Sequence, residues 1–170
     1  MHLLDDPSAY VRLDPSGMMR RIKDLPDQCC QAWQQAMSLT IPADYRNCDQ
    51  VVILGMGGSA IGGDLLRDAV AQECPVPIRV IRDYGLPADV GPSSLVIGSS
   101  YSGETEETLS AFQEASRRGA QLAVVAGGGR LKQEARSRLL PLLTIDYQSE
   151  PRAALGYGFF LLLGLLHNLG

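Results

Sequence analysis

The sequence predicts an α/β fold, a three-layer αβα sandwich around a five-stranded parallel sheet, preceded by a helical arm. Three observations lead to this prediction. From residue 49 onward, short apolar runs rich in β-branched residues alternate with longer helical segments, which is the pattern of βαβ units. Glycine-rich stretches directly follow several of the apolar runs. Residues 1–44, in contrast, contain no strand-like run.

Five segments have the composition of buried parallel strands, being short, apolar and β-branched. They are Gln50–Leu54, Ile78–Ile81, Leu95–Ile97, Leu122–Val125 and Leu142–Ile145. A helix is expected after each of the first, third and fourth strands, and Gly119 is a suitable C-cap for the helix that ends at Arg118. Since crossovers between parallel strands are right-handed, the loops after the strands should meet at the carboxyl edge of the sheet.

The arm is expected in residues 1–44, packed on a core formed by residues 45–150. Ser16 should cap a short helix that ends at Pro26, and a second helix should follow it.

The C-terminal segment, residues 151–170, contains an unbroken apolar run from Phe159 to Leu163 that continues past Gly164. The run is shorter than the roughly 20 residues that a membrane span needs. A helix that is apolar all round is buried instead. We therefore expect no membrane partner, and either a contact between two copies of the chain or the edge at which a longer protein continues.

Length, charge and cysteine spacing exclude several classes of function. The chain has 170 residues, of which 45% are hydrophobic and 20% charged, as in a soluble domain with one core. Its net charge of −4 argues against a nucleic-acid partner, which needs a basic face. The four cysteines have no CxxC or Cys/His spacing, which predicts reduced thiols in a cytoplasmic protein and no metal site.

One stretch combines a strand, a tight turn and a helix start: LVIGSSYSGETEET, residues 95–108. Its hydroxyl groups stand beside the unpaired N–H groups of a helix N-terminus, which favours phosphate binding. The stretch contains no lysine or arginine, so hydroxyls and backbone dipoles would hold the anion. A second interpretation needs no ligand: Ser and Thr can cap the helix while Glu104, Glu106 and Glu107 complement its dipole.

The first glycine-rich loop, GMGGSA at residues 55–60, follows a strand and precedes a helix. It fits the dinucleotide fingerprint G-x-G-x-x-A, and Asp83 stands near the position of the acid that would bind a ribose. A second, hydroxyl-rich loop on the next strand but one favours a compact phosphorylated ligand over an extended dinucleotide. A dinucleotide-binding domain is the weaker alternative.

Together, GMGGSAIGGDLL, SYSGETEET and EPRAALGY resemble the amino-terminal half of the bifunctional phosphoglucose/phosphomannose isomerases, members of the sugar isomerase (SIS) superfamily. The resemblance covers nearly the whole chain and implies the flavodoxin-like SIS fold. It implies that Arg152 lies near the sugar carbons, where its charge can stabilise an enediolate. It also implies that the substrate and its phosphate are bound by Gly57, Gly58, Ser59, Ser100, Ser102 and Thr105.

This chain departs from the family in two loops. The family usually has Asn at the position of Glu104, and its third loop usually begins with Ser, where this chain has Ala126 and Gly127.

The resemblance also implies a function that this chain cannot complete alone. The family's enzymes contain two such domains, and the second supplies the base glutamate, the ring-opening histidine and the catalytic lysine. His2, His167 and Glu150 are poor substitutes. We expect binding of hexose 6-phosphates with little or no isomerisation, and interconversion of glucose or mannose 6-phosphate with fructose 6-phosphate once a second domain is supplied. No cofactor is implied. The alternative is a non-catalytic phosphosugar sensor or regulatory subunit, and either form is expected to be a homodimer.

Overall fold

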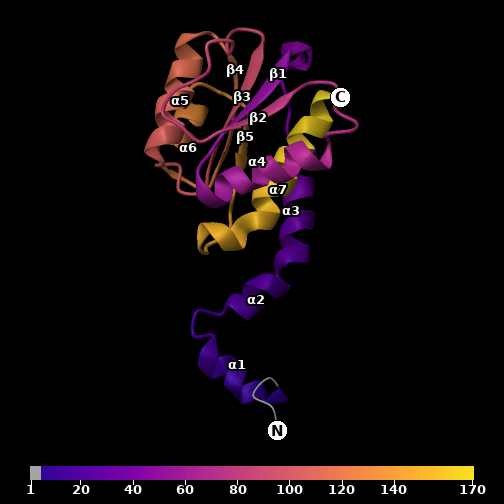
Figure 1. Ribbon diagram of the computed structural model, residues 1–170, viewed down its shortest axis with the longest axis vertical. Helices are drawn as coiled ribbons and strands as arrows, with labels where there is room; N and C mark the ends of the chain where they lie inside the picture. The colour runs from indigo at the N-terminus through magenta and orange to yellow at the C-terminus, as the bar shows by residue number, and fades with distance from the viewer. Residues whose placement is uncertain (1–4) are drawn as a thin grey trace.

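The computed structural model describes residues 5–170 and contains the predicted five-stranded sheet (Figure 1). All strands are parallel, in the order β2-β1-β3-β4-β5. Their bounds are β1 Gln50–Leu54, β2 Ile78–Ile81, β3 Ser94–Ser100, β4 Gln121–Ala126 and β5 Leu142–Thr144. The α/β prediction and the strand count are therefore confirmed.

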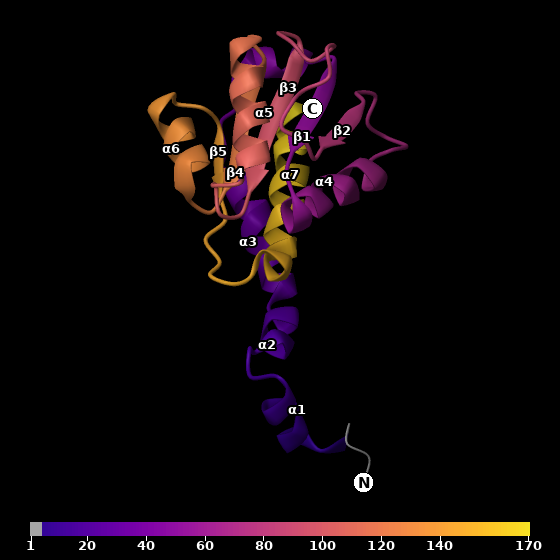
Figure 2. The same cartoon turned by 60° about the vertical axis from the view of Figure 1, so that its left-hand side comes forward.

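Alternate residues of the strands face two separate cores, as a period of two requires. Val52, Val96 and Val124 face the layer made by α5 (Glu106–Arg117) and α6 (Gly129–Ser137). Val51 and Ile53 face the opposite layer, made by α3 (Leu25–Met37), α4 (Gly57–Ala69) and α7 (Leu155–Leu169). Figure 2 shows the sheet between these two layers.

The apolar C-terminal helix α7 packs against α3 and α4 inside this chain. Gly164 allows this close approach, because a Cβ at that position would lie 2.4 Å from the Cβ of Ala36. With the preceding turn it forms a helix, Pro151–Leu169, long and apolar enough to cross a membrane, but half of that segment is buried in the protein. Burial against α3 and α4 accounts for the apolar composition that the sequence shows.

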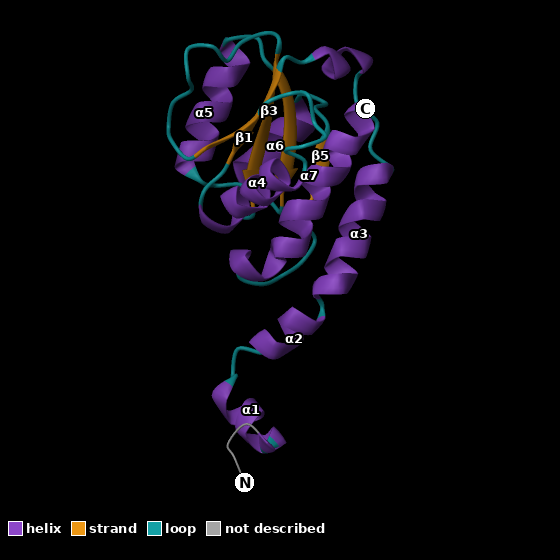
Figure 3. Cartoon of the chain, turned by 45° about the vertical axis from the view of Figure 1, so that its right-hand side comes forward, coloured by secondary structure: helices purple, strands orange, loops and turns teal. Residues whose placement is uncertain are grey.

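The N-terminal helix α1 (Pro7–Leu13) projects away from the body, α2 (Met18–Lys23) touches it through the ion pair of Arg21 with Glu150, and α3 packs along it (Figure 3). The buried residues Ala32 and Ala36 of α3 belong to the core, whereas Val11 and Leu13 of α1 are exposed. The prediction that Ser16 caps the short helix before Pro26, which is α2, is wrong. Asp14 caps it instead, because its carboxylate accepts the backbone N–H groups of Met18 and Met19, each at 2.7 Å.

The strand β3 is longer than predicted and runs to Ser100. Ser99 and Ser100 are therefore strand residues with buried side chains, rather than loop residues. The loop that follows begins at Tyr101, directly at the carboxyl edge of the sheet.

Candidate functional site

The first and second glycine-rich loops lie side by side at the carboxyl edge of β1 and β3. The backbone N–H of Tyr101 donates to Oγ of Ser59 at 3.2 Å, and Oγ of Ser99 donates to the carbonyl oxygen of Ser59 at 3.5 Å. The predicted convergence of these two loops is confirmed. We call this edge, with both loops, the rim.

Hydroxyl groups organise the second loop from within. Oγ of Ser100 lies 2.9 Å from Oγ1 of Thr105 and accepts the N–H of Gly103 at 3.0 Å. Ser100 is only 1% exposed, so its hydroxyl shapes the loop rather than lying open on the surface. Ser102 is exposed, and its Oγ accepts the N–H of Glu104 at 3.2 Å.

Two helices begin at the rim without a side-chain cap. Met56 is the N-cap residue of α4 and Thr105 that of α5, and neither side chain hydrogen-bonds to its helix. The hydroxyl of Thr105 is directed to Ser100 instead. The rim therefore combines two helix N-termini, each with partial positive charge, and the hydroxyls of Ser59 and Ser102, an arrangement suited to an anion.

Residues of the second loop form hydrogen bonds with the third loop, residues 126–128, and with the start of α6 that follows it. The carboxylate of Glu104 accepts the backbone N–H of Arg130 at 2.8 Å and its Nε at 2.7 Å, and the N–H of Leu131 donates to the carbonyl of Gly103 at 3.0 Å. The first turn of α6 is thus already satisfied by protein groups. These contacts with Arg130 also hold the pKa of Glu104 below its ordinary value. The carboxylate that could repel an anion at α5 is paired with a cation.

Glycine is required where these two loops touch. Gly103 has φ of +71°, and a Cβ there would lie 1.8 Å from the carbonyl oxygen of Gly128. Any side chain would push the loops apart.

Arg152 lies in a short 3₁₀ turn, Pro151–Ala154, beside the first loop. A Cβ on Gly58 would be 3.4 Å from the carbonyl carbon of Pro151 and 3.5 Å from the backbone nitrogen of Arg152. Arg152 is exposed, and no carboxylate among residues 5–170 forms an ion pair with it. Its backbone therefore lies beside the first loop, and its side chain is exposed there.

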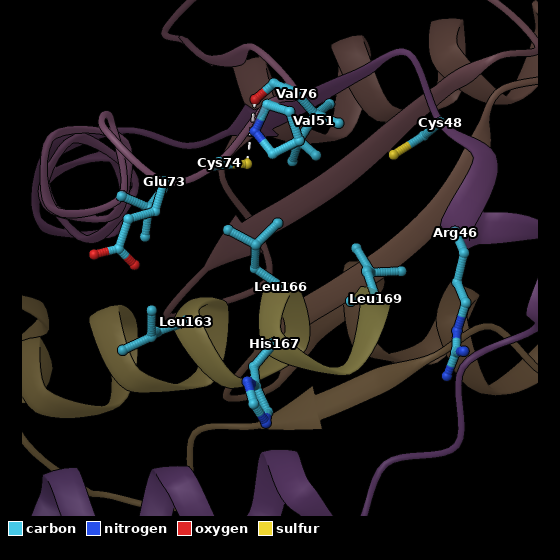
Figure 4. A pocket seen from close by; sticks show the side chains of 13 residues that line it. Arg46, Cys48, Val51, Glu73, Cys74, Val76, Leu163, Leu166, His167 and Leu169 are labelled. Atoms are coloured by element: carbon cyan, nitrogen blue, oxygen red, sulfur yellow. Dashed lines mark hydrogen bonds between the residues drawn. The ribbon is translucent and has the colours of Figure 1, made fainter.

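The acid–base candidates lie elsewhere or are engaged. Glu150 forms an ion pair with Arg21 of α2. His167 contacts Trp33, with ring centroids 5.4 Å apart and the rings tilted by 44°, and it lines a cavity of about 270 Å³ beside Val51 of β1 that also has Arg46 and Glu73 in its wall (Figure 4). His2 lies outside the described residues. Within residues 5–170, no three His, Cys, Asp or Glu side chains gather at one point to hold a metal ion.

Sequence reasoning missed three residues that shape the rim. Arg130 pairs with Glu104, Gln28 donates from α3 to the carbonyl of Ala153 at 2.9 Å, and Tyr101 binds the backbone of the segment after β5. Each partner is far away in the sequence, so no local pattern marks it. For Tyr101 the one available signal was its position between two site serines.

The similarity to known proteins agrees with this geometry. Over 153 residues the chain is 46% identical to the bifunctional phosphoglucose/phosphomannose isomerase of Caldicellulosiruptor bescii, a match that covers 90% of this chain and 45% of that protein. The chain is an SIS domain related to this family. It spans less than half the length of that relative, consistent with a single SIS domain. No protein-family model matches the chain.

Solved structures show the same SIS fold. The chain is similar to the Vibrio vulnificus NanR protein complexed with ManNAc-6P, with a TM-score of 0.62 and 17% identity, covering 95% of this chain and 66% of NanR. It is also similar to the sugar isomerase domain of an RpiR transcription factor from Sphaerobacter thermophilus, with a TM-score of 0.59 and 18% identity. That match covers 92% of this chain and 91% of the other.

Proposed function

We propose that this SIS domain binds a hexose 6-phosphate at the rim, with the phosphate between the N-termini of α4 and α5. The observation that supports this most directly is the pair of helix starts without side-chain caps. They stand beside the hydroxyls of Ser59, Ser102 and Thr105, while Gly57 and Gly58 let a ligand approach the backbone. In this proposal Ser100 positions the loop, because its hydroxyl accepts from Gly103 and donates to Thr105, which leaves the proton of the Thr105 hydroxyl for the phosphate.

The proposed chemistry is that of an aldose–ketose isomerase, completed by a second domain or a partner chain. In such a reaction a base moves a proton between C1 and C2 of the open-chain sugar, through an enediolate. Arg152 would stabilise the negative charge of that intermediate. Since Glu150 is paired with Arg21 and His167 lies at the other edge of the sheet, we expect the base and the ring-opening group to come from outside this chain. We place the protein in the cytoplasm.

Removing the hydroxyls of Ser102 and Thr105 tests phosphate binding. We expect the Ser102→Ala, Thr105→Val double variant to bind fructose 6-phosphate about 10- to 100-fold more weakly in isothermal titration calorimetry, because it loses hydrogen bonds to a charged group. Ser93→Ala is the matched control, since its Oγ bonds to Asp49 at the opposite edge of the sheet and its loss should leave the affinity unchanged. Equal affinity of wild type and double variant would contradict the proposal.

Two alternatives give different results with the same preparation. A non-catalytic sensor is favoured by the likeness to the transcription-factor domain, which is of similar extent. It predicts saturable binding of fructose 6-phosphate without turnover in a coupled assay even when the second half of a relative is added, whereas turnover lost in Arg152→Ala supports the isomerase. A dinucleotide-binding domain predicts thermal stabilisation by NAD or NADP and none by sugar phosphates.

A further inference from the structure

One phenol at the rim makes three hydrogen bonds to a segment that lies more than 40 residues further along the chain. The hydroxyl of Tyr101 lies 2.6 Å from the carbonyl oxygen of Tyr147 and 2.7 Å from that of Ser149, and it accepts the N–H of Ser149 at 2.7 Å. A phenol has a single proton, so the two carbonyls share it, while the oxygen accepts from Ser149. All of the bonding capacity of this hydroxyl is therefore used on residues 147–149.

The segment held in this way, residues 147–153, carries Arg152, and we call it the strap. The strap also touches the first loop, where Gly58 lies against Pro151 and Arg152, and it bonds to α2 and α3. Oη of Tyr147 donates to Asp24 at 3.2 Å, Glu150 pairs with Arg21, and Gln28 donates to the carbonyl of Ala153. Tyr101 is the contact that comes from the second loop of the rim.

Tyr101 also joins the first and second loops of the rim. Its own backbone N–H donates to Oγ of Ser59 in the first loop, and it stands between Ser100 and Ser102 in the second. One residue thus connects the first loop, the second loop and the strap. Since a staggered aromatic side chain is rigid once its hydroxyl is fixed, the distance between the second loop and the strap depends on this side chain.

We propose that Tyr101 is a positioning residue that sets the location of Arg152 relative to the phosphate loops. This inference rests on the proposed function, because it assigns Arg152 to the sugar and the loops to the phosphate. Tyr101 has no role toward the phosphate itself in this scheme. Its hydroxyl governs the part of the site that a sugar reaches and that an isolated phosphate does not.

The consequence is a selective defect in Tyr101→Phe, which removes only the hydroxyl. We expect its affinity for fructose 6-phosphate to fall about tenfold, the size of one hydrogen-bond contribution, while its affinity for inorganic phosphate changes less than about twofold. In amide hydrogen exchange without any ligand, the N–H of Ser149 and its neighbours in the strap should exchange faster than in wild type.

Tyr45→Phe is the matched control. Oη of Tyr45 donates to the carbonyl of Leu122 at 3.0 Å and accepts the N–H of Leu122 at 3.3 Å. The control therefore also loses a hydroxyl that both donates and accepts a backbone hydrogen bond. It lies at the start of β4, the opposite end of that strand from the rim. Far-UV circular dichroism establishes that both variants fold, and Tyr45→Phe should leave both affinities and the exchange of the strap unchanged.

The possible results separate this inference from the proposed function. If Tyr101→Phe lowers the affinity for fructose 6-phosphate and for inorganic phosphate equally, the inference is overturned, because the phenol would then act on the loop that binds the phosphate. Unchanged exchange in the strap would also overturn it. If wild type binds inorganic phosphate but no hexose phosphate, the proposed function fails, and the exchange data alone still decide whether Tyr101 holds the strap.

Discussion

Glu104 is a carboxylate in the second loop of the rim, the loop that we propose binds an anion. Its side chain turns to the first turn of α6, where it accepts two hydrogen bonds from Arg130. Asn usually occupies this position in the family that the sequence resembles, and a neutral amide could not form an ion pair with Arg130. In this chain Glu104 joins the second loop to the third while its charge is balanced.

This pairing predicts a pH dependence. The hydrogen bonds from Arg130 lower the pKa of Glu104 in the folded state, so the folded form favours the ionised carboxylate. The stability that results is complete above the ordinary carboxyl pKa and is lost as pH falls through the lowered, folded-state value. We expect Glu104→Gln to be less stable than wild type in urea unfolding at neutral pH, with the difference shrinking as pH falls below the ordinary carboxyl pKa. The exposed Glu73→Gln is the control, and a difference that is constant with pH would contradict the assignment.

At the scale of elements, the close contact between α3 and α7 depends on small residues. A Cβ on Gly164 would stand 2.4 Å from the Cβ of Ala36, and one on Gly62 of α4 would stand 2.6 Å from the carbonyl oxygen of Gly158. The glycines that interrupt the apolar run are thus the places where neighbouring helices approach. The run is the central helix of one face of the sandwich.

Substituting Gly164 tests this packing. Gly164→Ala should destabilise the protein by about 1–3 kcal/mol in urea unfolding, because overpacking forces the helices apart. This outweighs the roughly 0.5–1 kcal/mol that alanine contributes in a helix relative to glycine. Gly91→Ala is the control, since a Cβ at that position meets no atom within 4 Å. An unchanged midpoint for Gly164→Ala would show that α3 and α7 are less tightly packed than the structure indicates.

For the whole molecule, we expect α1 to contribute little to the free energy of unfolding of the body. Val11 and Leu13 of α1 are 80% and 64% exposed, so α1 adds little apolar burial to the fold. We expect deletion of residues 1–13, which keeps Asp14 and its bonds to α2, to change the free energy of unfolding by less than about 0.5 kcal/mol, as measured in urea. A large loss of stability would mean that the arm packs on the body in solution.

The homodimer remains a prediction about the whole molecule as well. The apolar helix that suggested it is buried within one chain, whereas α1 and α2 expose apolar side chains. Sedimentation velocity of the full chain measures the oligomeric state, and a monomer at every concentration would contradict the prediction.

The sequence by itself determined the sheet, the order of its helices and the meeting of the two glycine-rich loops. Those features follow from local patterns, namely apolar strands, glycine at tight turns and the right-handed crossover. It also identified Ser102 and Thr105 as candidates, because hydroxyls beside a helix start are visible in a short stretch, while Ser59 was implied by the family resemblance.

Only the tertiary structure decided which groups at the rim are free and which are engaged. Glu104 and Arg130 are 26 residues apart, and Tyr101 and Ser149 are 48 apart. A hydrogen bond requires two atoms within about 3 Å in the right direction, and no periodicity along the chain encodes such a meeting. For that reason the buried role of Ser100 and the hold of Tyr101 on the strap could be seen only in the folded molecule.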